Sequence, residues 1–235
     1  VVPVFSTGMG GASERNLVGD KLTSYYKDAV QSSKQIAENM LRGFGEIETQ
    51  EWPMQHNDPK IMQLFNLADS NKLFVMFHPK PGQKNAIKNI IETFPDTTFI
   101  IHMFQEDFSK ERSNIIDLMK AYDNLYFSID ADHTLYDGQT GLLYKYEDRS
   151  LSSAKSSFVS DFDSSYKNLL NNAVSRYKPL VDAVPNKVFW GTESSLAYNF
   201  EPEVYDRVIK FSRIFIGKLN PEHQEMVAYK NALRV

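Results

Sequence analysis

Residues 72–83, "KLFVMFHPKPGQ", begin with an apolar run that ends on His78 and is followed at once by a loop with two prolines and a glycine. A second stretch, "TTFIIHMFQ" at residues 97–105, repeats the pattern and reaches His102 after an apolar run. Continuous runs of Val, Ile and Phe are typical of parallel strands that are covered on both faces. Two such strands that each end on an imidazole predict a site at one edge of a parallel sheet.

Further apolar runs of the same character occur along the chain, with helical patterns between them. Together with the two above, the strand candidates are residues 1–7, 43–49, 72–78, 97–102, 124–130 and 187–193. Apolar residues spaced by three and four predict the helices, for example at Ala86, Ile87, Ile90, Ile91 and Phe94. Repeated strand-and-helix units fit either a (β/α)8 barrel or an open, doubly wound α/β sheet.

One long connection, residues 131–165, exceeds the length of a simple loop. Its aromatic and aliphatic residues stand in a segment otherwise rich in Ser, Asp and Gly; they are Tyr136, Leu142, Leu143, Tyr144 and Tyr146. This mixture predicts a lid that closes over a substrate. An ordinary surface insertion with a few buried anchors is the alternative.

Composition limits the classes of partner. At 235 residues, 42% of them hydrophobic, the chain is large enough for one α/β domain with a buried core. A net charge of -4 argues against a nucleic-acid partner. No run approaches the roughly 18 apolar residues of a membrane span, and no secretory signal pattern occurs, so we expect no membrane partner. The lack of cysteine leaves the compartment open, with the cytoplasm preferred to the periplasm or the exterior.

Several strand candidates end in groups that can bind a metal or move a proton. These groups are Glu46, Glu48, His78, His102 and Glu193. Neutral imidazoles and a carboxylate from different strands form a ligand set suited to zinc, with manganese as the alternative. Each histidine could instead be a hydrogen-bonded structural residue. His133 and its neighbours Asp130 and Asp132 fit either the same site or a solvated loop, and His56 and His223 are expected on the surface.

The ordered segments also resemble a known family. "TFPDTTFIIHM" (93–103), "AYDNLYFSID" (121–130), "KVFWGTES" (187–194) and "LNPEHQEMVAYKNALRV" (219–235) are similar in order and spacing to the last barrel strands and terminal helix of the amidohydrolase superfamily. The segments resemble specifically its branch of metal-dependent hydrolases, which includes lactonases and decarboxylases. The resemblance extends back through residues 72–83 and 43–48, and it implies a TIM (β/α)8 barrel.

The resemblance also assigns roles to residues. It implies that His78 and His102 are the metal ligands that end the fifth and sixth barrel strands. From its place at a strand end, we predict Glu46 as a further metal ligand. Glu193 stands where the family has an aspartate that accepts and passes on the proton of water, and this change moves the carboxylate by one methylene. We predict His133, Tyr136 and Glu48 as substrate-binding residues.

The chain departs from the family pattern in a second way, because it contains no His-x-His pair. The sequence starts inside a strand, so we expect a single barrel domain, residues 1–235, whose first strands are missing from this chain, with residues 131–165 as a lid. The function implied is hydrolysis of a small amide, ester or lactone by metal-activated water. A nonoxidative decarboxylase and a degenerate barrel that only binds ligands are the alternatives. We expect a small-molecule substrate and self-association into a homo-oligomer.

Overall fold

The computed structural model describes residues 4–5, 20–36, 41–47, 49, 55–103, 105–138 and 141–235. The chain separates into two compact units, Val1–Phe127 together with Val235, and Ser128–Arg234. The boundary falls inside a strand, so that strand contributes its first half to one unit and its second half to the other.

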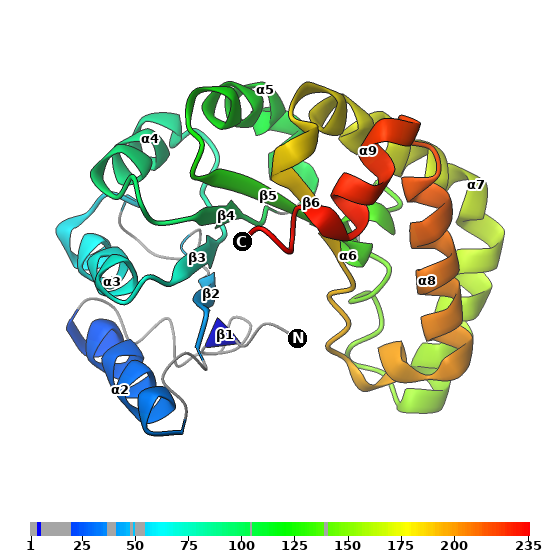
Figure 1. Ribbon diagram of the computed structural model, residues 1–235. Coiled ribbons are helices and arrows are strands. Elements are labelled where there is room, and N and C mark those ends of the chain that lie inside the picture. Colours follow the sequence, from blue (N-terminus) through cyan, green and yellow to red (C-terminus); the bar gives the residue numbers. More distant parts are fainter. Residues whose placement is uncertain are drawn as a thin grey trace. The chain divides into compact units, whose positions relative to one another are not determined.

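The first unit is a layer of parallel strands with helices along its outer side (Figure 1). Its strands are β1 (Val4–Phe5), β2 (Gly43–Ile47), β3 (Phe74–Phe77), β4 (Phe99–Ile101) and the first half of β5 (Leu125–Asp130). Its helices are α2 (Asp20–Ile36), α3 (Pro59–Ser70), α4 (Lys84–Thr93) and α5 (Gln105–Ala121). Each strand lies within a predicted range, so the predicted α/β class with a parallel sheet is confirmed.

The strands of this unit pair in chain order. β1 pairs with β2, β2 with β3, β3 with β4 and β4 with β5, and every pair is parallel. A doubly wound sheet would reverse its strand order at a switch point, and no reversal occurs among these strands. Sequential parallel pairing is what consecutive strands of a barrel show. Closure of the sheet into a barrel stays a prediction.

Aromatic side chains from α3, β3 and β4 form the core of the first unit. Phe65, Phe77 and Phe99 are fully buried. The ring centroid of Phe99 lies 5.6 Å from that of Phe65 and 6.3 Å from that of Phe77, both in edge-to-face arrangements. Aromatic pairs prefer this geometry because the positive edge of one ring meets the negative face of the other. The core therefore fixes β3 and β4 against α3.

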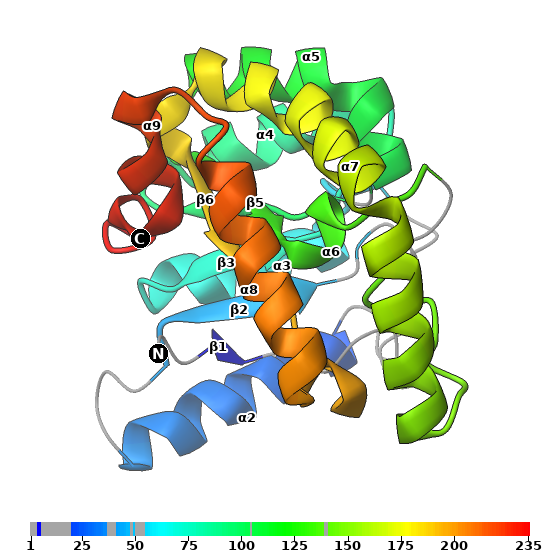
Figure 2. The same ribbon diagram turned by 90° about the vertical axis from the view of Figure 1, so that its right-hand side faces the viewer.

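The second unit is mainly helical. It contains the second half of β5, α6 (Ala131–Thr134), α7 (Leu151–Ala183), η2 (Pro185–Lys187), β6 (Val188–Gly191), η3 (Ala197–Phe200), α8 (Pro202–Ile216), α9 (Pro221–Glu225) and η4 (Met226–Lys230). β6 follows β5 in the strand order of the sheet. The long helices α7 and α8 pack against each other (Figure 2), with Phe162 and Phe211 in edge contact and Arg207 in a bidentate ion pair with Asp163.

The long connection of the sequence is partly helical in the structure. Residues 151–165 form the first turns of α7, and the described residues 135–138 and 141–150 are non-helical. Four of the five apolar residues noted there are buried, and the exception is Tyr144. Tyr198 donates a hydrogen bond to the carbonyl oxygen of Leu143 and fixes the middle of the segment. These contacts favour the alternative of an insertion with buried anchors, and closure over a substrate stays a prediction.

Within the described residues, no helix has both the length and the apolar character that a membrane crossing requires.

Asn231 ties the C-terminal turns to β6 in the second unit. Its side chain is fully buried, and its amide nitrogen donates to the carbonyl oxygens of Pro185 and Val188, each at 2.7 Å. Loss of the amide would leave both carbonyl groups without this donor, away from water.

We therefore expect Asn231→Ala to lower the free energy of unfolding by about 2 kcal/mol. Urea unfolding followed by circular dichroism measures the change. Leu233→Ala is the matched control, since Leu233 is 81% exposed two residues away and its removal should change stability by less than about 0.5 kcal/mol. Equal effects of the two substitutions would contradict the role of Asn231.

Candidate metal centre

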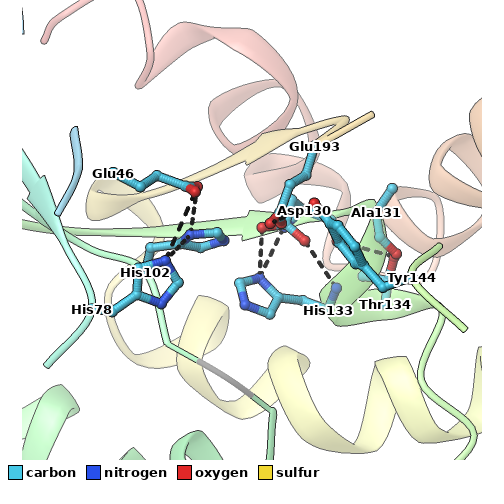
Figure 3. A network of polar contacts seen from close by, with 9 residues as sticks. All are labelled: Glu46, His78, His102, Asp130, Ala131, His133, Thr134, Tyr144 and Glu193. Carbon is cyan, nitrogen blue, oxygen red and sulfur yellow. Dashed lines mark hydrogen bonds and ion pairs between the residues drawn. The ribbon is translucent and has the colours of Figure 1, made fainter. Parts of the chain in front are cut away.

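Three side chains of the first unit meet where three neighbouring strands end (Figure 3). Glu46 lies near the end of β2, His78 directly follows β3, and His102 directly follows β4. Hydrogen bonds between neighbouring strands hold the backbone of both histidines. The His78 N–H donates to the Ile47 carbonyl oxygen at 2.9 Å, and the His102 N–H donates to the Phe77 carbonyl oxygen at 3.0 Å. The convergence predicted from the strand ends is therefore present.

Glycine brings Glu46 to this position. At Gly45 a side chain would place its Cβ 2.7 Å from the Cβ of Met76, so only glycine allows β2 to approach β3 this closely. The pairing register between β2 and β3 shifts between Phe44 and Ile47. Such irregularities redirect side chains at the ends of strands, and here the redirected side chain is Glu46. Thr49 then donates its hydroxyl to the carbonyl oxygen of His78 at 2.6 Å, which holds the two strand ends together.

The three side chains lie within contact distance of one another. His102 Nδ1 lies 2.7 Å from Glu46 Oε1 and 3.1 Å from His78 Nε2, and His78 Nε2 lies 3.9 Å from Glu46 Oε2. Both imidazoles are buried, with 5% of His78 and 1% of His102 exposed. The side chain of Glu46 is 22% exposed, so the cluster reaches solvent through its carboxylate.

Glu46 is ionised at neutral pH. Burial by itself would raise the pKa of this carboxyl group, but the hydrogen bond from His102, the interaction with His78 and the charges of both rings outweigh burial. The pKa of Glu46 therefore lies well below its usual value. A carboxylate beside two imidazoles gives a ligand set of two nitrogens and one or two oxygens.

This ligand set fits a divalent ion. One ligand atom from each residue lies within 4.8 Å of the others, and neighbouring ligands of a tetrahedral zinc ion, with bonds of about 2.0 Å, are separated by about 3.3 Å. The contact between His102 Nδ1 and both Glu46 and His78 also brings three lone-pair donors to one point. A single proton can be shared between two of these atoms, whereas a cation engages all three.

The structure places the other predicted site residues as follows. Asp130, His133 and Glu193 lie together in the second unit, and Glu193 receives a hydrogen bond from the Tyr144 hydroxyl at 3.4 Å. Tyr136 is 5% exposed, and the guanidinium of Arg176 stacks 4.5 Å from its ring centroid. Their predicted catalytic and substrate-binding roles stay predictions. Glu48, the remaining substrate-binding prediction, lies outside the described residues.

The prediction that His56 lies on the surface is wrong, because the residue is completely buried. Its Nε2 accepts a hydrogen bond from the Lys80 N–H at 2.7 Å, and its own backbone N–H donates to Gln83 Oε1 at 3.1 Å. It therefore anchors the loop that follows His78. Burial lowers the pKa of His56 to about 3, and the positive charge of Lys80 adds to this effect.

The lowered pKa of His56 predicts a dependence of stability on pH. Because the unfolded chain binds a proton near pH 6.5 and the folded chain binds it only near pH 3, the stabilising contribution is complete above pH 6.5 and is lost as the pH falls toward 3. Between pH 6.5 and pH 5.0 the loss should be about 1.5 kcal/mol. Denaturant unfolding of the wild type and of His56→Gln measures it. The two proteins should differ in slope over this interval, and parallel pH profiles would contradict the assignment.

Comparison with solved structures places the fold among known proteins. A probable 2-pyrone-4,6-dicarboxylic acid hydrolase from Acinetobacter baumannii, with citric acid bound, aligns with a TM-score of 0.52 and 11% identity over 99% of this chain and 82% of that one. An amidohydrolase from Burkholderia multivorans with bound zinc aligns with a TM-score of 0.48 and 12% identity, over 87% of this chain and 68% of that one. A 5-carboxyvanillate decarboxylase from Sphingomonas paucimobilis aligns with a TM-score of 0.45 and 10% identity, over 99% and 78%.

No family model and no curated protein sequence matches the chain. At 11% identity the likeness concerns the fold, and the fold assignment rests on the first of these structures, the only one of the three with a TM-score above 0.5. The chain therefore shares its α/β fold with that solved hydrolase structure.

Proposed function

We propose that the chain is an amidohydrolase-type, metal-dependent hydrolase of a small amide, ester or lactone. Glu46, His78 and His102 bind the ion, which is zinc or manganese. The observation that carries the proposal is the meeting of these three donors at the ends of three consecutive parallel strands. The C-terminal ends of parallel strands are where enzymes of this architecture place their chemistry.

The residues of the cluster suit such a role. A divalent ion held there supplies Lewis-acid chemistry, since it polarises a carbonyl group and makes water a stronger acid. Glu46 stays ionised and offers its oxygens, while the imidazoles of His78 and His102 offer nitrogen lone pairs from buried positions. Backbone hydrogen bonds fix the main chain of both histidines at the strand ends, and the contacts of His102 Nδ1 with Glu46 and His78 orient the rings.

Two further points support hydrolysis. The fold is shared with a protein described as a probable hydrolase of 2-pyrone-4,6-dicarboxylic acid, which is a lactone. Glu193 occupies the sequence position where the family has its proton-transferring acid. A proton-transfer role for Glu193 in this chain is part of the proposal and rests on the resemblance.

The experiment determines which reaction the chain catalyses and whether that reaction requires a metal ion. The chain is purified without chelators and assayed on a lactone, an aryl ester and an anilide with a pH indicator, while released carbon dioxide is measured separately on carboxylated aromatic compounds. We expect turnover of at least one of the first three classes. Dipicolinate should abolish it, and zinc or manganese chloride should restore it.

Two outcomes would contradict the proposal. Release of carbon dioxide without hydrolysis would identify a decarboxylase. Metal-loaded protein that binds its ion through Glu46, His78 and His102 but turns over none of the substrates would identify a barrel that only binds ligands.

A further inference from the structure

The first unit contains a small pocket at the edge of the sheet where β2 and β3 begin, opposite the edge at which these strands end. Its walls come from the end of α2, the residues before β2 and the turn between α3 and β3, and its volume is about 270 Å³. Val30 and Leu73, both buried, supply apolar surface. The charged residues that line it are Lys34, Arg42 and Lys72, and none of the described lining residues is acidic.

The positive charges of this pocket are not balanced by carboxylates. Lys34 Nζ donates to Asn71 Oδ1 at 2.7 Å, so a neutral amide holds the ammonium group in place without compensating its charge. Within the described part of the chain, no carboxylate forms an ion pair with Lys34, Arg42 or Lys72. The chain as a whole has a net charge of -4. The surplus of positive charge is therefore local to this pocket, where an anion would compensate it.

Lys72 occupies a backbone position at which glycine is usual. It follows Asn71, the C-cap of α3, and has φ of 55°, in the left-handed region. The N–H groups of Lys72 and Leu73 donate to the carbonyl oxygens of Asp69 and Ala68, each at 3.0 Å. In this type of helix ending glycine commonly takes the left-handed position, because it has no Cβ. A lysine here lowers stability, and a role in binding a ligand explains why it is kept.

A phosphate group is the ligand that suits these features. It carries a charge of about -1.5 to -2 near neutral pH and has three oxygens that accept hydrogen bonds. Ammonium and guanidinium groups are donors only, and a guanidinium binds phosphate through two parallel hydrogen bonds. The pocket volume lies just below the range of about 300 to 1,000 Å³ that is typical of drug-sized ligands. These properties favour a small phosphate compound.

We propose that the pocket lined by Lys34, Arg42 and Lys72 binds the phosphate group of a small molecule. The site is separate from the cluster at the other edge of the sheet and does not depend on the proposed hydrolase function. Lys34 and Lys72 also lie at the C-terminal ends of α2 and α3, where a cation compensates the partial negative charge of the helix end. The test separates this structural role from phosphate binding.

The variants are chosen to preserve the local fold. Lys34→Gln removes the charge but keeps a side-chain N–H for Asn71 Oδ1. Lys72→Gly removes the charge and places glycine at the left-handed position, and Arg42→Gln removes the guanidinium. Lys60→Gln is the matched control, since Lys60 is an exposed lysine in the first turn of α3 and does not line the pocket.

The measurement is isothermal titration calorimetry of the full chain with inorganic phosphate and with phenyl phosphate at constant ionic strength. We expect one saturable site with a Kd below about 1 mM in the wild type and in Lys60→Gln. Each of the three pocket variants should bind about tenfold more weakly, because it loses a charge-assisted hydrogen bond. Tighter binding of phenyl phosphate would assign the site to phosphate esters, and equal binding would assign it to free phosphate.

Two further measurements complete the test. Lys72→Gly should raise the midpoint of urea unfolding when phosphate is absent, because the left-handed backbone suits glycine. A His78→Gln/His102→Gln variant should keep the phosphate affinity of the wild type, since these residues lie at the other edge of the sheet. Circular dichroism checks that every variant is folded.

Three results would overturn the proposal. The first is no saturable binding of either compound by the folded wild type. The second is wild-type affinity in the three pocket variants, and lower stability of Lys34→Gln in that case would identify the helix-end role. The third is loss of binding in His78→Gln/His102→Gln alone, which would place the anion at the candidate metal centre. Phosphate binding by a chain that hydrolyses none of the substrates would leave this site standing and refute only the proposed function.

Discussion

Replacing His78 and His102 together by glutamine is expected to lower the zinc affinity of the first-unit site by more than about 100-fold, or about 2.8 kcal/mol. Changes to groups that merely orient metal ligands already cost up to about 100-fold, and these substitutions remove two ligands themselves. The carboxylate of Glu46 would remain, but one carboxylate without its imidazole partners binds zinc weakly. Competition with a chelating dye measures the zinc affinity of this site in the wild type and in the double variant.

The matched control for this double substitution is His223→Gln. His223 is an imidazole on α9 in the second unit and does not belong to the cluster of Glu46, His78 and His102, so the same chemical change there should leave the zinc affinity unchanged. Wild-type affinity in the folded double variant would show that the two histidines are structural. Each would then be a hydrogen-bonded structural histidine and not a metal ligand.

Phe99→Ala is expected to lower the free energy of unfolding by about 3 to 5 kcal/mol, the largest effect on stability that we predict. Phe99 is fully buried in β4 and packs edge-on against Phe65 and Phe77. Its removal costs the transfer free energy of the ring and leaves a cavity that the rigid strands cannot fill. Because β4 also carries His102 at its end, zinc affinity should fall with stability.

Urea unfolding of the zinc-free chain, followed by circular dichroism, measures this effect without a contribution from bound metal. Phe200→Ala is the control, since Phe200 is 60% exposed and its removal should change stability by less than about 0.5 kcal/mol. A loss below about 1 kcal/mol for Phe99→Ala would show that the aromatic core of the first unit is not packed as described.

The parts of the fold that could be predicted are those with a strong local signal. The runs before His78 and His102 are continuous and apolar because their strands are buried on both faces, and a polar residue ends each run where the sheet edge begins. Parallel pairing of neighbouring strands then places both imidazoles side by side without further information. The meeting of His78 and His102 could therefore be predicted from the sequence, and their role as metal ligands stays a prediction.

Other features depend on contacts that the sequence does not display. The position of Glu46 depends on the close approach of β2 to Met76 that Gly45 allows. The burial of His56 depends on the hydrogen bond that its Nε2 accepts from the Lys80 N–H. The long helix α7 begins in a segment rich in serine and aspartate. The helical spacing of the buried residues Phe158 and Phe162 is therefore hard to recognise in the sequence. These outcomes are decided by tertiary packing.

Asp130 and His133 are brought together by a local capping pattern that the sequence contains. The pattern Asp-x-x-His directly after an apolar strand places an N-cap acceptor and a residue at the third helical position so that they face each other. Such a pair is held within one turn, whatever surrounds it. The spacing favours this contact, which the sequence interpretation left open between the site and a solvated loop.

The most direct test of the central claim is a crystal structure of the zinc-loaded chain with anomalous data collected on both sides of the zinc absorption edge. We predict an anomalous peak bonded to Glu46, His78 and His102, with bonds of about 2.0 to 2.2 Å to two imidazole nitrogens and a carboxylate oxygen. No peak at these three residues, with the hydrogen bond from His102 Nδ1 to Glu46 Oε1 still at 2.7 Å, would contradict it.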